Sequence, residues 1–420
     1  MVDFGWAVRQ AEFVNPAAEA IRFESEPRDP RLERWLKDYP PSIFSEQLYQ
    51  SIELMERYSI ELAAGLLDQL ALGDPLRQWS SPEELCRLLC FQQQFRFAIG
   101  WILQRLIETG CIEERTDADT RRYRLRETPK LTGIGRLRAA GINIDPANEA
   151  TLDLLDHAAS LYPAVAQGKQ NGEQGMFDSC GIALWLNYFS NANLTYAVNN
   201  WIGAVAAAER LSSRSRLRIL ELGAGAGSGT EVLLRCLDER ELLPRIERYV
   251  ATEPNAFFRR RAQRELAKLY PSVAMEWAPL DVNSPWKKQE TAIGEFDLIY
   301  AVNVFHVARD LSFSLNEARS ALANDGWLVI GECLRPSANQ PIYPELMFQI
   351  LESFIAVETD ADIRPNPGFL TADQWRRAFA RGGIERVEVA PDVESIHEIY
   401  PHFFTGAICG QNSVAGNQFG

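Results

Sequence analysis

The sequence is short of positive charge: 43 lysine and arginine residues stand against 57 aspartate and glutamate residues, which gives a formal net charge of −14. General nucleic-acid binding depends on basic side chains that neutralise phosphates. The deficit therefore argues against a nucleic-acid partner. It favours a small-molecule acceptor or substrate, either free or carried by a protein.

The sequence also lacks the cysteine spacing of a metal site or a disulfide framework. Its 7 cysteines are an odd number, and Cys86 and Cys90 have no nearby Cys or His pair. Unpaired thiols are typical of a reducing compartment, so we expect a cytoplasmic protein without a bound metal. Neither a signal peptide nor an apolar run long enough for a membrane span is present, so we expect no membrane partner.

What is present is a glycine-rich loop after an apolar stretch. Residues 218–230 read RILELGAGAGSGT, and a predicted helix follows over 230–237. Glycine permits positive φ and close approach of the backbone to a ligand. The N–H groups at a helix N-terminus then point at whatever lies on the loop. The stretch therefore predicts a nucleotide-type cofactor site.

Two cofactors compete for this loop. The dinucleotide fingerprint G-x-G-x-x-G would need glycine where Ser228 stands, and it requires no acid before the first glycine. S-adenosylmethionine (SAM) has an ammonium and a sulfonium group but no pyrophosphate, so an acid beside the loop suits it. The pattern favours SAM over a dinucleotide or a purely structural turn. The residues predicted to hold it are Glu221, Gly223, Ala224, Gly225 and Gly227.

Further predicted strands end in side chains that suit the rest of SAM. Ligands of open α/β sheets bind outside the carboxyl ends of the strands. Glu253 can accept hydrogen bonds from both ribose hydroxyls, and Asp281 can accept one from the adenine amino group. The residues predicted at these ends are Glu253, Pro254, Asp281, Val282 and Asn303. The strands are expected at 249–254, 273–280, 295–303 and 327–332, the last after a turn at 324–326.

The amino-terminal third predicts a separate unit. Residues 1–40 are expected to form an irregular arm with one helix at 30–36. Residues 41–130 show three helices and a hairpin, which is a winged-helix pattern. The helix at 95–106 is apolar on most faces, which is typical of a buried helix and leaves few base-reading groups. We expect a dimerisation or lid module, hence a possible homodimer, rather than a DNA contact.

The remaining chain divides into three predicted parts. Residues 131–210 form a connector at 129–147 and two lid helices, 147–161 and 183–208, with a glycine-rich loop at 168–175 between them. Residues 211–410 form the SAM-binding domain, and 411–420 a tail. This domain is expected to end with a helix at 345–354, a capped helix at 371–381 and strands at 384–389 and 403–409. The residues expected to line the cleft from the lid are Tyr188, Phe189, Asn191, Tyr196 and Trp201.

Three stretches resemble the carbon-methyltransferase domains of polyketide synthases: ILELGAG at 219–225, ATEPNAFF at 251–258 and AVNVFHVARDL at 301–311. The resemblance covers about residues 180–410. It implies the class I SAM-dependent methyltransferase fold, an α/β architecture with a Rossmann-like, seven-stranded mixed sheet. The winged-helix-like region is not explained by that family and looks more like the dimerising domain of small-molecule O-methyltransferases.

The resemblance also implies a catalytic pair, which matches His306 and Glu332 here. Glu332 would hold and polarise the imidazole, and His306 would take a proton from the acceptor. The family places a lid tyrosine near the substrate, and Tyr196 and Tyr188 both remain candidates. The chain departs from the family at 226–229, where Thr-Gly-Gly-Thr is usual, and at Glu253, where aspartate is common. Neither change removes the required chemistry.

The favoured function is methyl transfer to the carbon of an enolisable or β-keto small molecule. O- or N-methylation of a secondary metabolite is the close alternative. A SAM-sensing winged-helix regulator and a catalytically silent scaffold are further alternatives. The net charge argues against the regulator, and the joint presence of His306 and Glu332 argues against the scaffold.

Overall fold

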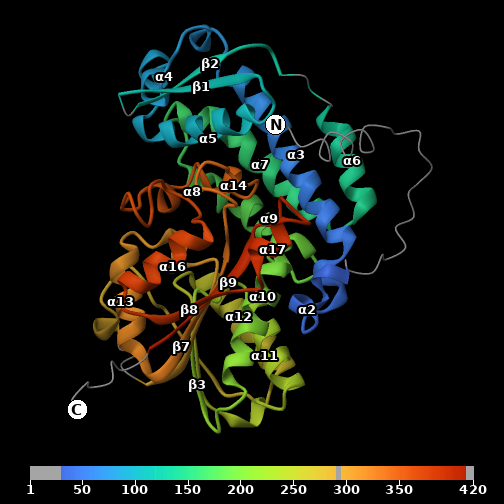
Figure 1. Cartoon of the computed structure of the whole chain (residues 1–420), viewed down its shortest axis with the longest axis vertical. Helices are drawn as coiled ribbons and strands as arrows, with labels where there is room; N and C mark the ends of the chain where they lie inside the picture. Colours follow the sequence, from blue (N-terminus) through green and yellow to red (C-terminus); the bar gives the residue numbers. More distant parts are fainter. Residues whose placement is uncertain (1–29, 119, 130, 132, 290–294, 413–420) are drawn as a thin grey trace.

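The computed structural model describes residues 30–412, except 119, 130, 132 and 290–294. A helical part, blue to green in Figure 1, stands above an α/β part coloured yellow to red. The predicted arm at 1–29 and the tail from 413 lie outside the described residues. The helix expected at 30–36 forms as η1 (Pro30–Leu32) and α2 (Glu33–Leu36).

Three helices and a hairpin form in the predicted order. After η2 (Pro41–Phe44) they are α3 (Glu46–Gln69), α4 (Pro82–Leu88) and α5 (Arg96–Ile107), followed by the antiparallel pair β1 (Ile112–Asp117) and β2 (Thr120–Leu125). The short helices η3 (Pro75–Arg77) and η4 (Gln93–Phe95) precede α4 and α5. A capping box begins α4: the Ser81 side chain accepts from the Glu84 N–H, and the Glu84 carboxylate accepts from the Ser81 N–H.

The apolar faces of α5 are covered within the chain itself. The helix packs against α3 and α4, and its apolar side chains belong to one continuous core that also includes α10. The residues with no exposed area are Ala98, Ile99, Ile102, Leu103 and Leu106. The apolar character that led us to expect a dimerisation helix is therefore accounted for by burial in a single chain.

The predicted connector at 129–147 is wrong in part, because α6 (Ile134–Ile144) forms there. It packs against α3 at a point of close approach, where a Cβ on Gly141 would lie 2.6 Å from Leu54 Cδ2. Glycines and a proline near its ends suggested coil, but tertiary packing supports the helix. The next helix, α7 (Asn148–Ala166), begins as predicted and continues through Pro163.

The single helix predicted over 183–208 is two helices, α9 (Ser179–Tyr188) and α10 (Leu194–Leu211). Between them Asn193 adopts an extended backbone, and its Nδ2 donates to the Tyr188 carbonyl at 3.0 Å. An asparagine side chain that bonds to nearby backbone competes with helix continuation. After the break α10 packs along β6, β7 and β9 of the sheet, whereas α9 packs against α7 and α8.

Three smaller predictions also fail. The loop at 168–175 contains α8 (Gly172–Met176), which Asn171 caps. The helix at 345–354 is split into α14 (Glu345–Phe348) and α15 (Glu352–Ile355), so that Phe348 and Phe354 both reach His306. The turn at 324–326 lies inside β7 as a bulge, with Asp325 at φ 59° and a register shift against β6.

The α/β part contains the predicted seven-stranded mixed sheet, in the order β5-β4-β3-β6-β7-β9-β8. Six strands run in one direction, and β9 alone of these seven runs antiparallel to them, between β7 and β8. The strands are β3 (Leu217–Leu222), β4 (Ile246–Thr252), β5 (Met275–Ala278), β6 (Phe296–Val302), β7 (Leu322–Cys333), β8 (Glu385–Ala390) and β9 (Thr405–Gln411).

Helices cover both faces of this sheet (Figure 1). Successive side chains of a strand point to opposite faces of the sheet. Ile219 and Leu298 therefore pack in one core with α10 and α11. The next residues, Leu220 and Ile299, pack in a second core with α13 and α16. These helices are α11 (Ser228–Glu239), α12 (Ala256–Leu269), α13 (Leu311–Ala321), α16 (Ala372–Arg381) and α17 (Val393–His397). The remaining short helices are η5 (Leu243–Arg245), η6 (Trp286–Gln289) and η7 (Phe305–Val307).

The strand order reverses between β3 and β6, and such a switch point opens a crevice at the carboxyl ends of the strands. Within the described part of the chain, no helix is both long and apolar enough to cross a membrane.

Candidate functional site

The glycine loop after β3 takes the backbone conformations that only glycine adopts without strain. Gly223, Gly225 and Gly227 have φ of 60°, 54° and 92°. A Cβ on Gly223 would lie 2.6 Å from Val304 Cγ2, so the loop is pressed against the chain that follows β6. At Gly225 a Cβ would meet nothing closer than 4.0 Å, because that side of the loop is open.

This open side faces a cavity of about 400 Å³ at the carboxyl ends of the strands. Nine of the ten residues predicted to bind the cofactor line it, and Gly227 does not. Gly227 faces α12 instead, where its Cβ would be 3.0 Å from Ala262 Cβ. The predicted residues in the lining are Glu221, Gly223, Ala224, Gly225, Glu253, Pro254, Asp281, Val282 and Asn303.

Glu221 is a buried carboxylate at the base of the cavity. Its Oε1 accepts a hydrogen bond from Thr230 Oγ1 at 2.9 Å, and its Oε2 accepts one from the Tyr249 hydroxyl at 2.7 Å. Burial raises the pKa of Glu221 to about 7, although both hydrogen bonds oppose the shift. A cation placed in the cavity would favour the ionised form.

Two further carboxylates are fixed at the neighbouring strand ends. Glu253 accepts from the Gly225 N–H at 3.0 Å and the Asn255 N–H at 2.8 Å, and burial raises the pKa of Glu253 above its usual range. Asp281 is exposed and accepts from the backbone N–H of Asn283 at 2.9 Å. Each carboxylate is therefore oriented before any ligand arrives, with acceptor lone pairs left for hydroxyl or amino groups.

Sequence reasoning missed Asn200 on α10. Its Nδ2 donates to Asn191 Oδ1 at 2.8 Å, and the residue lines the cavity. Its buried Oδ1 has no hydrogen-bond partner among the residues that the structure describes. Buried polar atoms normally have a partner, so a ligand with a donor fits here. No local pattern marks Asn200, because it comes from a helix aligned with the loop only in the fold. With the three carboxylates, this acceptor makes the cavity fit SAM, which carries an ammonium, ribose hydroxyls and an amino group.

An aromatic wall closes the other side of the cavity. Of the five lid residues predicted, Phe189 and Tyr196 line it, with Phe177 and Phe258 as unpredicted additions. Burial raises the pKa of Tyr196 to about 12. The other three lid residues lie outside the lining. Tyr188 packs behind Tyr196, with ring centroids 5.2 Å apart, and Asn191 donates to the Ser228 carbonyl at 3.0 Å. Trp201 is buried in the core on α10.

His306 and Glu332 form a buried pair at the ends of η7 and β7. The His306 Nδ1 lies 2.9 Å from Glu332 Oε2. The other oxygen, Oε1, accepts from the backbone N–H groups of Val304 at 3.1 Å and Phe305 at 2.9 Å. Because this carboxylate already accepts from the backbone, we assign Nδ1 of His306 as the donor of the hydrogen bond to Oε2. The pair lies outside the cavity lining, but Asn303, Val304 and Val307 beside it belong to that lining.

Arg364 holds the loop that carries His306. Its guanidinium is buried and donates to the carbonyls of Ala308 at 2.6 Å and Phe305 at 3.2 Å. Burial lowers the pKa of Arg364 to about 10. No local sequence pattern predicts this contact, because residues 305–308 and 364 are distant in the chain.

Comparisons with known proteins agree with this geometry. Residues 220–328 match the family model described as a methyltransferase domain. The solved CurJ carbon methyltransferase has a TM-score of 0.72 at 22% identity, over 87% of this chain and 93% of that one. The DszA carbon methyltransferase has a TM-score of 0.68 at 20% identity, over 93% and 99%. The polyketide synthase PksM of Bacillus subtilis (strain 168) is 24% identical over 248 residues, 58% of this chain.

The chain spans only 6% of the length of PksM and 9% of the related synthase PksR of the same organism. The predicted class I methyltransferase fold is confirmed, and so is the resemblance to the carbon-methyltransferase domains of polyketide synthases.

Proposed function

We propose that this chain, a SAM-dependent methyltransferase of class I fold, methylates the carbon of an enolisable or β-keto small molecule. One observation carries the proposal: a histidine–glutamate pair is buried beside the cofactor cavity, with Nδ1 held by Glu332 so that Nε2 is the ring nitrogen that would accept a proton. The names of the relatives support an acceptor of polyketide type, either free or attached to a carrier protein.

The cavity residues would hold SAM by complementary chemistry. Glu221 and the unpartnered Asn200 Oδ1 suit the ammonium group, Glu253 suits the ribose hydroxyls, and Asp281 with Val282 suits the adenine. When bound, SAM supplies a methyl group that its sulfonium already activates. The protein then has to exclude water, align the acceptor and remove a proton.

The His306–Glu332 pair supplies the proton acceptor. Nε2 of His306 would take the proton from the acidic carbon, while Nδ1–H continues to donate to Glu332. The carboxylate then faces an imidazolium and stabilises it. Backbone N–H groups of Val304 and Phe305 fix the carboxylate, so neither partner has to reorient during the reaction. Tyr196, which lines the cavity, is proposed to position the acceptor, whereas Tyr188 supports its ring from behind.

The test replaces each member of the pair. His306→Ala and Glu332→Gln should lower kcat by about 10²- to 10⁴-fold, the range expected when general-base catalysis is lost. SAM affinity by calorimetry should stay within about threefold, because neither side chain lines the cavity. Glu265→Gln, on α12 with a side chain that is 42% exposed, is the control and should leave both values unchanged.

Full turnover in both variants would show that the pair is not the base. NMR of the product from a β-keto ester and ¹³C-methyl SAM then identifies the methylated atom. A carbon-bound methyl supports the proposal, and an oxygen-bound methyl overturns it in favour of O-methylation.

A further inference from the structure

A second hollow, of about 320 Å³, lies where the helical part meets the α/β part. Its walls come from α4, α5 and β2 on one side and from residues 335, 349, 366 and 367 on the other. We call it the arginine hollow, because Arg96, Arg121 and Arg335 line it against a single acidic residue, Glu83. Each of these arginines lies within 4.0 Å of a glutamate, so the hollow offers an anion a set of guanidinium N–H donors rather than an excess of charge.

The two arginines at the rim are only loosely paired. Arg96 lies 3.6 Å from Glu83, and Arg121 lies 3.6 Å from Glu114, which are longer than hydrogen bonds. Arg121 also donates to Asn339 Oδ1 at 2.7 Å. Each guanidinium carries five N–H donors, so both retain donors for an anion, and the planar fork matches carboxylate and phosphoryl oxygens.

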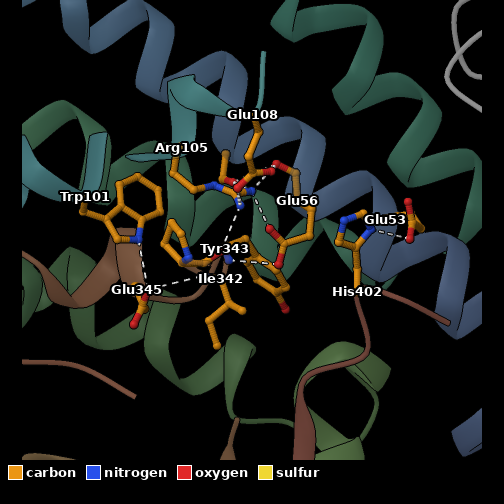
Figure 2. A network of polar contacts seen from close by, with 11 residues as sticks. Glu53, Glu56, Trp101, Arg105, Glu108, Ile342, Tyr343, Glu345 and His402 are labelled. Carbon is orange, nitrogen blue, oxygen red and sulfur yellow. Dashed lines mark hydrogen bonds and ion pairs between the residues drawn. The ribbon is translucent and has the colours of Figure 1, made fainter. Parts of the chain in front are cut away.

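The floor of the hollow is built from buried polar groups. Arg335 is 7% exposed and is held by Glu345 at 2.7 Å, and Gln349 is 4% exposed. Glu345 also accepts from the Trp101 indole N–H at 3.1 Å, so it joins α5 to the floor, as Figure 2 shows. A floor fixed from both parts of the chain gives a bound group a defined position.

The same segments that form the floor also pack on His306. Phe348, next to Gln349, lies 6.1 Å from the His306 ring, and Phe369, just after Pro367, lies 4.5 Å from it. On its other side His306 is flanked by Val304 and Val307 of the cofactor cavity. His306 therefore contacts segments whose neighbouring residues line the arginine hollow, and its own neighbours in the chain line the cofactor cavity.

We propose that the arginine hollow binds an anionic group, a carboxylate or a phosphoryl group, at the end of the methyl acceptor remote from the reacting carbon. This inference rests on the proposed function, since it assumes that an acceptor reaches His306. Arg96 and Arg121 would hold the anion at the rim, and Gln349 would contact the uncharged chain of the acceptor. Binding energy at the remote end then orients the reacting carbon.

The test uses three β-keto thioesters of equal length that end in a neutral amide, a carboxylate or a phosphate monoester. With the intact protein, at least one charged probe should have a KM about tenfold below that of the amide, the size of effect expected of charge-assisted hydrogen bonds. The charged probe with the greater advantage identifies the anion. Equal KM values for all three probes would overturn the proposal.

Arg96→Gln/Arg121→Gln should abolish the advantage while leaving kcat for the amide probe and SAM affinity unchanged. Arg124→Gln is the matched control, because Arg124 lies on the same strand but pairs with Glu113 outside the hollow, and it should keep the advantage. Retention of the advantage in the double variant would contradict the proposal.

A binding measurement distinguishes failure of the anion site from failure of the proposed methyl transfer. If no probe is methylated, calorimetry with the phosphate-ended probe still reports on the hollow. Heat of binding in the intact protein that vanishes in the double variant supports the anion site. If the intact protein shows no heat of binding, the anion site is overturned.

Discussion

At the residue scale, the site depends on charged groups that are buried before any ligand binds. Glu221, Glu332 and Arg364 are each at most 3% exposed. Their partners differ: two hydroxyls for Glu221, a histidine and backbone N–H groups for Glu332, and backbone carbonyls for Arg364. Groups that are costly to ionise inside a protein are typical of functional sites, where a ligand or a reaction uses the charge.

Glu221 should make the stability of the ligand-free protein depend on pH. The pKa of Glu221 is about 7 in the fold, against an ordinary value of 4.5. Between these values the unfolded chain loses the proton and the folded chain keeps it, so stability falls as pH rises through that window. Glu221→Gln should remove this loss and become more stable than the unchanged protein by about 3 kcal/mol at about pH 8, but not at about pH 5.

Urea unfolding without SAM at the two pH values measures this difference. The same variant should bind SAM more weakly, since the carboxylate that suits the ammonium is gone. A difference in stability that is equal at both pH values would show that Glu221 does not titrate in the window.

Single residues also set the limit of what the sequence could predict about the site. Glu253, Asp281 and Asn303 were found because strand ends of a parallel sheet converge at one edge, so their chain order is enough. Asn200 and Arg364 were missed because they reach the site from a helix and a loop whose alignment depends on tertiary packing. The hydrogen bond between His306 and Glu332 was expected from the resemblance rather than from spacing.

At the element scale, the glycine loop combines two different demands. Gly225 leaves room toward the cavity, whereas Gly227 lies against α12 and caps α11 in a left-handed conformation. Gly225 therefore serves ligand contact, and Gly227, two residues later, serves helix packing.

Alanine at the two positions should separate these roles. Gly227→Ala should cost about 2–4 kcal/mol of stability, because a left-handed non-glycine residue costs about 1–2 kcal/mol and its Cβ would crowd Ala262. The folded fraction should still bind SAM with nearly unchanged affinity. Gly225→Ala should cost only about 1–2 kcal/mol but weaken SAM binding about tenfold or more, because its Cβ enters the cavity.

Thermal unfolding and calorimetry on both variants measure the two effects. Equal losses of affinity at both positions would contradict the assignment of Gly227 to packing alone.

Elements with a local signal could be predicted, and elements defined by packing could not. The strands around the loop and the caps at Ser81 and Thr371 follow from apolar runs and capping boxes read in a few residues. The break after Tyr188 and the helix α6 depend on an asparagine side chain bonding backward and on close contact with Leu54. Neither contact is visible in sequence periodicity.

At the scale of the whole molecule, a buried polar network joins the two parts of the chain (Figure 2). Arg105 on α5 pairs with Glu56 on α3 and donates to the Pro341 carbonyl at 3.0 Å. Glu56 in turn accepts from the Tyr343 N–H at 3.0 Å, and burial raises the pKa of Glu56. The helical part is therefore bonded to the segment that follows β7 and Glu332.

Arg105→Met should cost about 3–5 kcal/mol, because it leaves Glu56 buried without its cation. Adding Glu56→Gln should recover part of this loss, since the uncompensated charge is removed. Arg87→Met, on the exposed side of α4, is the control and should change stability by less than about 0.5 kcal/mol.

Denaturant unfolding followed by both tryptophan fluorescence and circular dichroism measures these values. The two probes should give one coincident transition in the unchanged protein, because the network and the shared core couple the parts. A loss in Arg105→Met no larger than that of the control would show that the network does not hold them together.

The position of β9 has a consequence for how the chain is synthesised. Thr405–Gln411 pairs with β7 on one side and β8 on the other, so the sheet remains split until these residues have left the ribosome. Until then β7, the strand that carries Glu332, keeps an unpaired edge of the kind that recruits other nascent chains. The sheet around Glu332 is therefore complete only after β9 has been made, and a chain truncated before Thr405 would be expected to aggregate rather than to fold with a weakened site.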